Sequence, residues 1–406
     1  MRTAGLLKRF TAMVLTVGTS ATVAAQEPAT TSRTAAIEQE QAEKEKSLHP
    51  YVATRAEKAV NQLGDILAGA GPVSFYPYLQ SAYSGGGFAF GAGYRHFVSP
   101  HNSVDVRGSY TISGYKRAEV EFTAPRLFTR RGELKVSGGW REATRVGFYG
   151  IGNDTVKAAR TNYDFQQPHV AATLVVKPTR RLWILGGGLE YTQWSQRPGE
   201  GTFPSVETVF TPQTLPGLGA KVTYVHTQGT AAFDWRTSPG YARRGGFYGV
   251  TAHDFTDTDS NFGFQQVDYE VIQHFPILRE TWTISLHGLA KTTADKGDQE
   301  IPFFMLPSLG GGSSLRGFSS HRFRDRNSLL LQAEWRIMVN RYLDTAVFYD
   351  AGKVTARTSD LDFKKLKHDY GIGARFHGPF ATLLRLELAR SNEVGLSMVF
   401  AASPVF

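Results

Sequence analysis

From Val73 to the end of the chain, apolar and polar residues alternate with a period of two, and no other feature of the sequence constrains the fold as strongly. Over 370–376, Tyr, Ile, Ala and Phe fall on one face of an extended strand, and Gly, Gly and Arg fall on the other. The segments 331–337 and 384–388 repeat this pattern. Soluble β-sandwiches also alternate, but these segments run for about ten residues or more, the length at which a tilted strand crosses a bilayer. The sequence therefore predicts an all-β fold, a transmembrane antiparallel β-barrel.

The connections between these segments alternate between short and long, and sixteen segments can be counted from Val73 onward. Long connections are expected at 151–160, 197–218, 294–327 and 356–367. Short connections are expected near 99–102, 128–132, 178–180, 238–245, 275–276, 340–341 and 378–379. An even strand count, with short turns at one edge and longer loops at the other, is typical of bacterial outer-membrane barrels, whose two chain ends face the periplasm.

The composition excludes several other classes of protein. No run of about 18 unbroken apolar residues exists, so no membrane-spanning helix is predicted. The chain contains no Cys, which excludes disulfides, thiolate metal sites and cysteine nucleophiles. The net charge of +9 comes from basic residues spread along the chain rather than from one cluster, so nucleic acid is not expected as a partner.

Residues 1–25 are predicted to be a signal peptide. Three basic residues precede an apolar stretch over 10–23, and Val23-Ala24-Ala25 places small residues at a cleavage site after Ala25. Removing Arg2, Lys8 and Arg9 with this segment lowers the formal charge from +9 to +6 (9 − 3).

The segment between the signal peptide and the barrel divides into two parts. Residues 26–50 are a polar periplasmic lead that is either disordered or a solvated helix. Residues 51–71 predict an amphipathic helix, about Tyr51 to Ala68, and a linker. The apolar stripe of this helix consists of Val52, Ala56, Val60, Leu63 and Leu67. Because a lone helix cannot bury such a stripe, we expect it to dock at the periplasmic mouth of the barrel, which spans 72–406.

One long loop and the two strands after it carry charges that are expected to meet inside the barrel. Phe348, Asp350 and Gly352 share one face of their strand, and facing Asp350 to lipid would cost several kcal/mol, so this face lines the lumen. Glu334, on the preceding strand, points inward for the same reason. The Gly-rich loop supplies Arg316, which can bind carboxylates bidentately. We therefore expect the loop to fold into the barrel with Arg316 held by Asp350 and Glu334; the alternative is that Arg316 lies in solvent.

These residues also carry a family resemblance. Leu315-Arg316-Gly317-Phe318, then Phe348-x-Asp350-x-Gly352, in this order and spacing, resemble the motifs of the surface-antigen superfamily of outer-membrane assembly proteins, which contains the BamA and TamA barrels. The loop motif Phe148 to Asp154 and the strands at 370–373 and 384–387 add to the likeness. The resemblance implies the same tucked loop, and an activity in inserting or translocating proteins or lipids. Those relatives carry periplasmic polypeptide-transport-associated domains, for which the 46 residues from 26 to 71 are too few.

The last residues resemble the C-terminal signal by which such barrels are recognised during assembly. The signal would consist of a glycine, two apolar residues at alternate positions and a final aromatic residue: Gly395, Met398, Phe400 and Phe406. This implies the barrel assembly machinery as a partner during biogenesis, besides outer-membrane lipid, including lipopolysaccharide, and client polypeptides or lipids.

No catalytic, metal or cofactor site is predicted. The glycines at 310–312 and 371–373 lack the strand–turn–helix setting of a phosphate loop, and the histidines lack metal-ligand spacing. Two functions remain open. One is the insertion or translocation that the resemblance implies, and the other is a passive pore or a surface-exposed structural barrel without insertase activity.

Overall fold

The computed structural model describes residues 38–43, 58, 74–179, 182–378, 381–402 and 404–406. The chain divides into two units, residues 1–54 and 55–406. In the first unit, residues 38–43 are α-helical and exposed, as a solvated helix would be. The predicted signal peptide and the apolar stripe of the predicted amphipathic helix lie outside the described residues. Within those residues, no helix is both long enough and apolar enough to cross a membrane.

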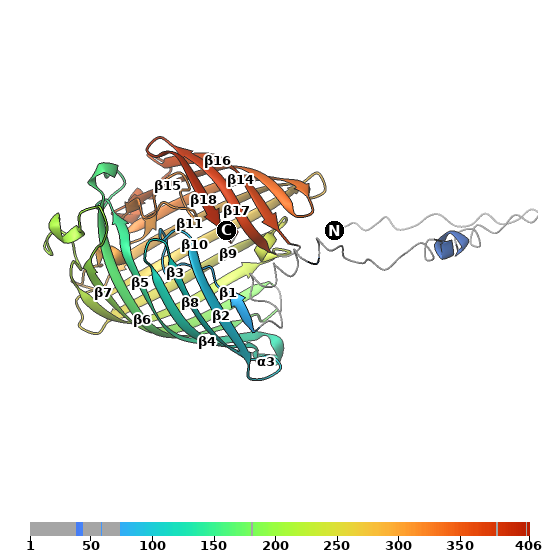
Figure 1. Ribbon diagram of the computed structural model, residues 1–406, viewed down its shortest axis with the longest axis horizontal. Coiled ribbons are helices and arrows are strands. Elements are labelled where there is room, and N and C mark those ends of the chain that lie inside the picture. The colour runs from blue at the N-terminus through green and yellow to red at the C-terminus, as the bar shows by residue number, and fades with distance from the viewer. Residues whose placement is uncertain (1–37, 44–57, 59–73, 180–181, 379–380, 403) are drawn as a thin grey trace, which may run out of the picture. The chain divides into compact units, whose positions relative to one another are not determined.

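Sixteen strands of the second unit form one antiparallel sheet in which each strand pairs with its neighbours along the chain (Figure 1). The predicted fold class and strand number are confirmed. The strands are β1 (Phe75–Pro77), β2 (Ala89–Phe97), β3 (Ser103–Thr111), β4 (Lys116–Arg126), β5 (Gly132–Phe148), β6 (Thr161–Val176), β7 (Trp183–Pro198), β8 (Lys221–Asp234), β9 (Gly245–Asp257), β10 (Phe264–Ile277), β11 (Trp282–Asp295), β14 (Asn327–Asn340), β15 (Leu343–Thr355), β16 (Lys367–His377), β17 (Thr382–Ser391) and β18 (Gly395–Ala401). The strand order begins with β1 and ends with β18, and these two edge strands are not paired with each other within the described residues.

The connections alternate in length as expected, with one misplaced turn. The predicted turn at 275–276 is wrong, because β10 continues through Pro276, which pairs with Thr283 of β11. The chain instead reverses at Leu278, Arg279 and Glu280, all three of which have positive φ. Since none of the three is Gly, Asn or Asp, the sequence carries no ordinary signal for a left-handed turn there.

Short helical turns lie in the connections rather than in the sheet. They are α3 (Leu127–Arg130), η1 (Lys157–Ala159), η2 (Val206–Thr208), η3 (Pro239–Tyr241), η4 (Phe303–Met305) and η5 (Thr358–Asp360). The turn labelled α3 also has left-handed backbone angles, at Phe128 and Thr129. The longest connection, 296–326, contains a separate two-stranded sheet of β12 (Ser308–Leu309) and β13 (Phe323–Arg324).

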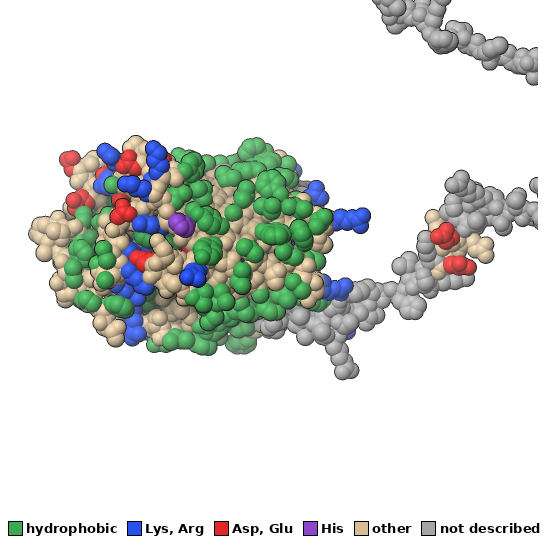
Figure 2. All heavy atoms as spheres, turned by 90° about the horizontal axis from the view of Figure 1, so that it is seen from above, with side chains coloured by type: hydrophobic (Ala, Val, Ile, Leu, Met, Phe, Trp, Pro, Cys, Tyr) green, Lys and Arg blue, Asp and Glu red, His purple; other side chains and the backbone are tan. Residues whose placement is uncertain are grey.

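The alternation along the strands separates an apolar outer face from a polar lumen. On β15, Val347 and Tyr349 are each 49% exposed. Phe348, which lies between them, and Asp350, which follows Tyr349, are buried. Figure 2 shows the outer face as an apolar belt over the strands, with charged side chains gathered beyond it. An apolar surface of this kind needs a lipid environment, since soluble monomers rarely expose such large apolar patches.

Where the long loops meet the strand ends, an apolar core fills the space between them. Phe303 of η4 packs edge-on against Phe148 of β5, with 5.1 Å between ring centroids, and against Tyr163 of β6, with 5.0 Å. Val206 of η2 and Leu215 belong to the same cluster. The connections 199–220 and 296–326 are therefore held onto the strands by aromatic packing and are not loose excursions.

Candidate functional site

The C-terminal half of the long connection 296–326 lies against the inner face of β14 and β15. Leu309, Leu315, Phe318 and Phe323 of this loop form an apolar cluster with residues that include Leu330 of β14. All of these side chains are buried, which fixes the loop backbone on both sides of Arg316. Two of the four predicted motif residues, Leu315 and Phe318, therefore act as apolar anchors.

Arg316 is fully buried and binds three carboxylates. Its Nε donates to Oδ2 of Asp350 and its Nη2 to Oδ1 of the same residue, both at 2.7 Å, which is a bidentate pair. Its Nη1 donates to Oε1 of Glu387 at 2.8 Å and lies 3.4 Å from Oε2 of Glu334. The guanidinium also lies over the ring of Phe348, with its carbon 3.4 Å from the centroid. The structure thus brings Arg316, Glu334, Phe348 and Asp350 together.

Two further arginines extend this cluster along β16 and β17. Arg375 donates to Glu387 at 2.7 Å and also contacts Glu334. Arg385 donates to Glu387 at 2.8 Å and to the carbonyl of Gly312 at 3.0 Å, so it too holds the loop. Nε of Arg336 on β14 also lies 3.6 Å from Oε1 of Glu334, so four arginines face the three carboxylates of Glu334, Asp350 and Glu387. Each of these carboxylates thus has at least one arginine beside it, which matters because an uncompensated buried charge costs several kcal/mol.

The glycines of the motifs stand where a side chain would collide. A Cβ on Gly317 would lie 2.6 Å from the Cβ of Asp369 on β16. A Cβ on Gly352 would lie 2.8 Å from the carbonyl oxygen of Leu329 and 2.9 Å from Cδ1 of Leu309. Gly317 and Gly352 therefore allow the loop and the strand wall to approach each other closely.

A buried histidine ties the loop to the first connection of the barrel. Nδ1 of His321 lies 2.8 Å from Oγ of Ser308, Nε2 lies 3.3 Å from the carbonyl of Ser84, and the ring stacks on Tyr83 at 4.7 Å. Burial, together with the nearby charge of Arg324, lowers the pKa of His321 to about 3. His321 is therefore neutral in the folded loop.

The predicted C-terminal residues separate into two places. Met398 and Phe400 are exposed on the outer face of β18, and Gly395 opens that strand with a positive φ. Phe406 instead lies against histidines of the inner wall, with its ring centroid 5.0 Å from that of His287 and 6.2 Å from that of His274. The structure therefore does not bring Phe406 onto the surface that Met398 and Phe400 share.

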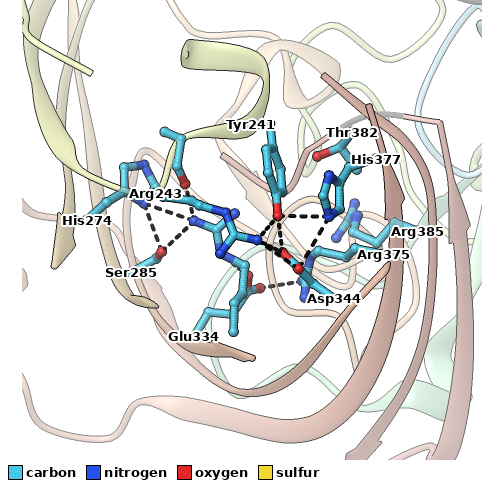
Figure 3. A network of polar contacts seen from close by, with 12 residues as sticks. Tyr241, Arg243, His274, Ser285, Glu334, Asp344, Arg375, His377, Thr382 and Arg385 are labelled. Carbon is cyan, nitrogen blue, oxygen red and sulfur yellow. Dashed lines mark hydrogen bonds and ion pairs between the residues drawn. The ribbon is translucent and has the colours of Figure 1, made fainter. Parts of the chain in front are cut away.

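At the short-turn end, the β8–β9 connection reaches across the lumen to β15, β16 and β17 (Figure 3). The hydroxyl of Tyr241 donates to Oδ2 of Asp344 at 2.5 Å and lies 2.8 Å from Nε2 of His377. Arg243 donates to Oδ1 of Asp344 at 2.9 Å. Thr382 donates to the carbonyl of Gly240 at 3.3 Å. This turn therefore lies across the short-turn mouth of the barrel.

Sequence reasoning predicted a short turn near 238–245, but it missed the buried contacts of this turn and the extension of the cluster. Arg385 and Glu387 alternate with leucines, and this signal could have placed both side chains in the lumen, although it does not give their distance from Arg316. Tyr241 lies in a short connection between two glycine-containing strands, and nothing in its neighbourhood indicates a buried polar anchor. Among the described residues, no group of His, Asp or Glu side chains is arranged to hold a metal ion.

Comparison with known proteins defines the class. The Omp85 superfamily domain matches residues 101–393, and the chain belongs to this superfamily of bacterial outer-membrane β-barrels. The family resemblance predicted from the motifs is confirmed. Among curated proteins, none matches the sequence.

Two solved structures share the fold. BamA from Haemophilus ducreyi lacking POTRA domains 1–3 is 19% identical, with a TM-score of 0.59 over 80% of this chain and 67% of that one. CdiB from Escherichia coli is 12% identical, with a TM-score of 0.51 over 80% of this chain and 58% of that one. The chain thus spans about three fifths to two thirds of these proteins, and at such identities the likeness extends to the fold alone.

Proposed function

We propose that this barrel assists the insertion or translocation of proteins or lipids at the outer membrane. In this proposal the short-turn edge and both chain ends face the periplasm. The lumen-facing loop stays in place while the wall of the barrel opens. Its motif consists of Leu315, Arg316, Gly317 and Phe318, and it is held by Glu334, Phe348, Asp350 and Gly352. Client polypeptides or lipids and the outer-membrane lipid itself are the partners.

The observation that carries the proposal is the weakness of the sheet at its two edges. The edge strand β1 has 3 residues and β18 has 7, whereas β5, inside the sheet, has 17. Short edge strands share few backbone hydrogen bonds with any partner, so a join between them opens at lower cost than any other part of the wall. An edge with unpaired backbone groups accepts an incoming strand.

The alternative of a passive pore fits these contacts less well. A pore needs an open passage, whereas here the loop around Arg316 occupies the lumen and the Tyr241 turn lies across one mouth. Aromatic packing around Phe303 fills the region beneath the long loops. We therefore expect low single-channel conductance.

The test measures client folding with the edges free and with the edges cross-linked. The rings of Phe88, just before β2, and Phe400 of β18 are 5.4 Å apart, so cysteines at these two positions can be joined by a short bis-maleimide. The chain contains no other cysteine. In vesicles, the free protein should accelerate the folding of an unfolded outer-membrane barrel, and the cross-link should remove most of this acceleration.

The matched control joins two strands in the middle of the wall. Thr230 of β8 and Thr251 of β9 are register partners, and cysteines there can be joined by the same reagent without touching the edges. This cross-link should leave client folding unchanged. In cells, depletion of the protein should lower the levels of other outer-membrane proteins; normal levels, together with no acceleration in vesicles, would contradict the proposal.

A further inference from the structure

The two ends of the barrel differ sharply in charge. The connections at the short-turn edge (98–102, 127–131, 177–182, 235–244, 278–281, 341–342 and 378–381) contain ten Lys and Arg residues and one acidic residue, Glu280. The ten are Arg130, Arg131, Lys177, Arg180, Arg181, Arg236, Arg243, Arg244, Arg279 and Arg341. The connections at the opposite edge also contain ten basic residues, but they contain ten acidic ones as well.

At the long-loop edge, the opposite charges pair with each other. Arg322 contacts Glu393 at 2.5 Å, Lys367 contacts Asp154 at 3.0 Å, and Arg326 contacts Asp295 at 2.6 Å. The hydrogen bond and charge of Lys367 hold the pKa of Asp154 below its ordinary value. Figure 2 shows this mixture of blue and red side chains at the left end of the barrel. The cations there are largely satisfied within the protein.

At the short-turn edge, most cations face outward without such a supply of carboxylates. Arg236 and Arg243 are half-buried and bind Asp234 and Asp344. Six others are exposed: Arg130, Arg131, Lys177, Arg244, Arg279 and Arg341. The one carboxylate of these connections, Glu280, lies 3.7 Å from Arg244. Without counting Arg341, whose ring neighbour is Tyr342, the exposed residues Arg130, Arg131, Lys177, Arg244 and Arg279 still give this edge a strong positive charge.

The distribution of these charges indicates what the ligand is. These five cations come from four of the seven connections, so they follow the rim around the barrel. Four of the six tryptophans lie exposed next to the same edge: Trp183, Trp235, Trp282 and Trp335. Exposed tryptophans mark the membrane interface of a barrel, and headgroup phosphates lie just beyond that level. An acidic protein would need a basic patch on one side, whereas a ring of cations fits a ring of lipids.

Two further features favour phosphate-bearing headgroups. Nine of the ten basic residues are arginines, whose planar guanidinium binds phosphate through two parallel hydrogen bonds. At two left-handed tips, an exposed apolar side chain stands beside an exposed arginine: Phe128 near Arg130, and Leu278 beside Arg279. Such tips can place an apolar group in the membrane interface while the arginine reaches the headgroup.

We propose that the basic rim at the short-turn edge, Arg130, Arg131, Lys177, Arg244 and Arg279, binds the headgroups of anionic phospholipids in the periplasmic leaflet. The inference rests on the orientation given under Proposed function, since that leaflet supplies phospholipid. It does not require insertase activity. Bound lipid would neutralise the rim and hold the short-turn edge at a fixed depth in the membrane.

The experiment uses the rim tryptophans as reporters in vesicles of known composition. Brominated phosphatidylglycerol and brominated phosphatidylcholine quench tryptophans that they contact, and mixtures give the relative binding of the two lipids at the barrel surface. We expect phosphatidylglycerol to be favoured several-fold in low salt, and the preference to fall towards one in high salt because screening weakens exposed charges. Equal binding of the two lipids in low salt would overturn the proposal.

A variant and its matched control assign the preference to the rim. Arg130→Gln, Arg131→Gln and Arg279→Gln together should abolish most of the preference for phosphatidylglycerol. Lys157→Gln, Lys364→Gln and Lys365→Gln remove the same charge from exposed positions in the long loops and should leave it unchanged. An equal loss in both variants would show that net charge, and not the rim, selects the lipid. Because this readout involves no client, its result is independent of the cross-linking test.

Discussion

Tyr241, on the turn between β8 and β9, stacks on His377 at the end of β16, with 3.7 Å between the ring centroids and 15° between the ring planes. The two residues are 136 positions apart in the chain. Their contact fastens a connection from the middle of the barrel to its C-terminal wall.

Tyr241→Phe should destabilise the barrel by about 1–2 kcal/mol, because the phenylalanine keeps the stacking but leaves buried Asp344 and His377 without the hydroxyl. Unfolding in urea, followed by tryptophan fluorescence, measures the change. Tyr248→Phe is the control, since its hydroxyl also binds a side chain, that of Gln273, but on the exposed face of β9. Equal effects of the two substitutions would mean that the turn contributes no more than a surface contact.

Arg316→Ala should destabilise the folded barrel by about 3 kcal/mol, because it leaves Asp350 buried with a charge that the arginine had balanced. Arg316→Glu should be worse, and adding Asp350→Arg should recover part of the loss. The coupling energy from this double-mutant cycle, measured by unfolding, isolates the pair. Additive effects of the two single substitutions would contradict a direct interaction.

Acid should loosen the loop around His321. The folded-state pKa, about 3, lies below the ordinary value near 6.5, so the unfolded loop binds more protons between these pH values. The stability is therefore fully present above about pH 6.5 and is lost as the pH falls, by about 2 kcal/mol at pH 5. Trypsin cleavage after the buried residues Arg322 and Arg324 should accelerate when the protein is pre-incubated at pH 5, and His321→Gln should remove this pH dependence.

Gly317→Ala should release the loop, because the added methyl group would lie 2.6 Å from the Cβ of Asp369, closer than two carbons can approach. We expect a loss of about 2 kcal/mol or more, read from the urea midpoint and from trypsin sensitivity of the loop. Gly229→Ala on β8 is the control, since its Cβ would meet nothing within 4 Å. Unchanged stability at position 317 would show that the loop is not packed against β16.

The features that could be predicted from the sequence are those that follow from the alternation of residues along each strand. The alternation along β14 to β17 predicts strands, and it places Glu334 and Asp350 in the lumen because a lipid-facing carboxylate is costly. From there, Arg316 is the natural partner of Asp350. No such local rule governs the third carboxylate, Glu387, because its distance from the loop depends on how the wall curves.

The features that could not be predicted depend on backbone angles or on distant contacts. The left-handed turn at Leu278, Arg279 and Glu280 has no glycine to mark it, so the sequence favours a turn at Pro276 instead. Phe406 fits a C-terminal signal by sequence, yet it stacks on His287 across the lumen. The contacts of Tyr241 depend on the fold of the whole barrel, since its partners lie on β15 and β16.

The Tyr241 turn also imposes an order on assembly. Its partners Asp344, His377 and Thr382 come late in the chain, so the polar groups of the turn find them only once β15, β16 and β17 are in place. Because a long stretch of chain must close before these contacts form, we expect this docking late in folding. A barrel released before its final strands are seated would leave this turn undocked, and the turn can therefore serve as an internal check that the wall is complete.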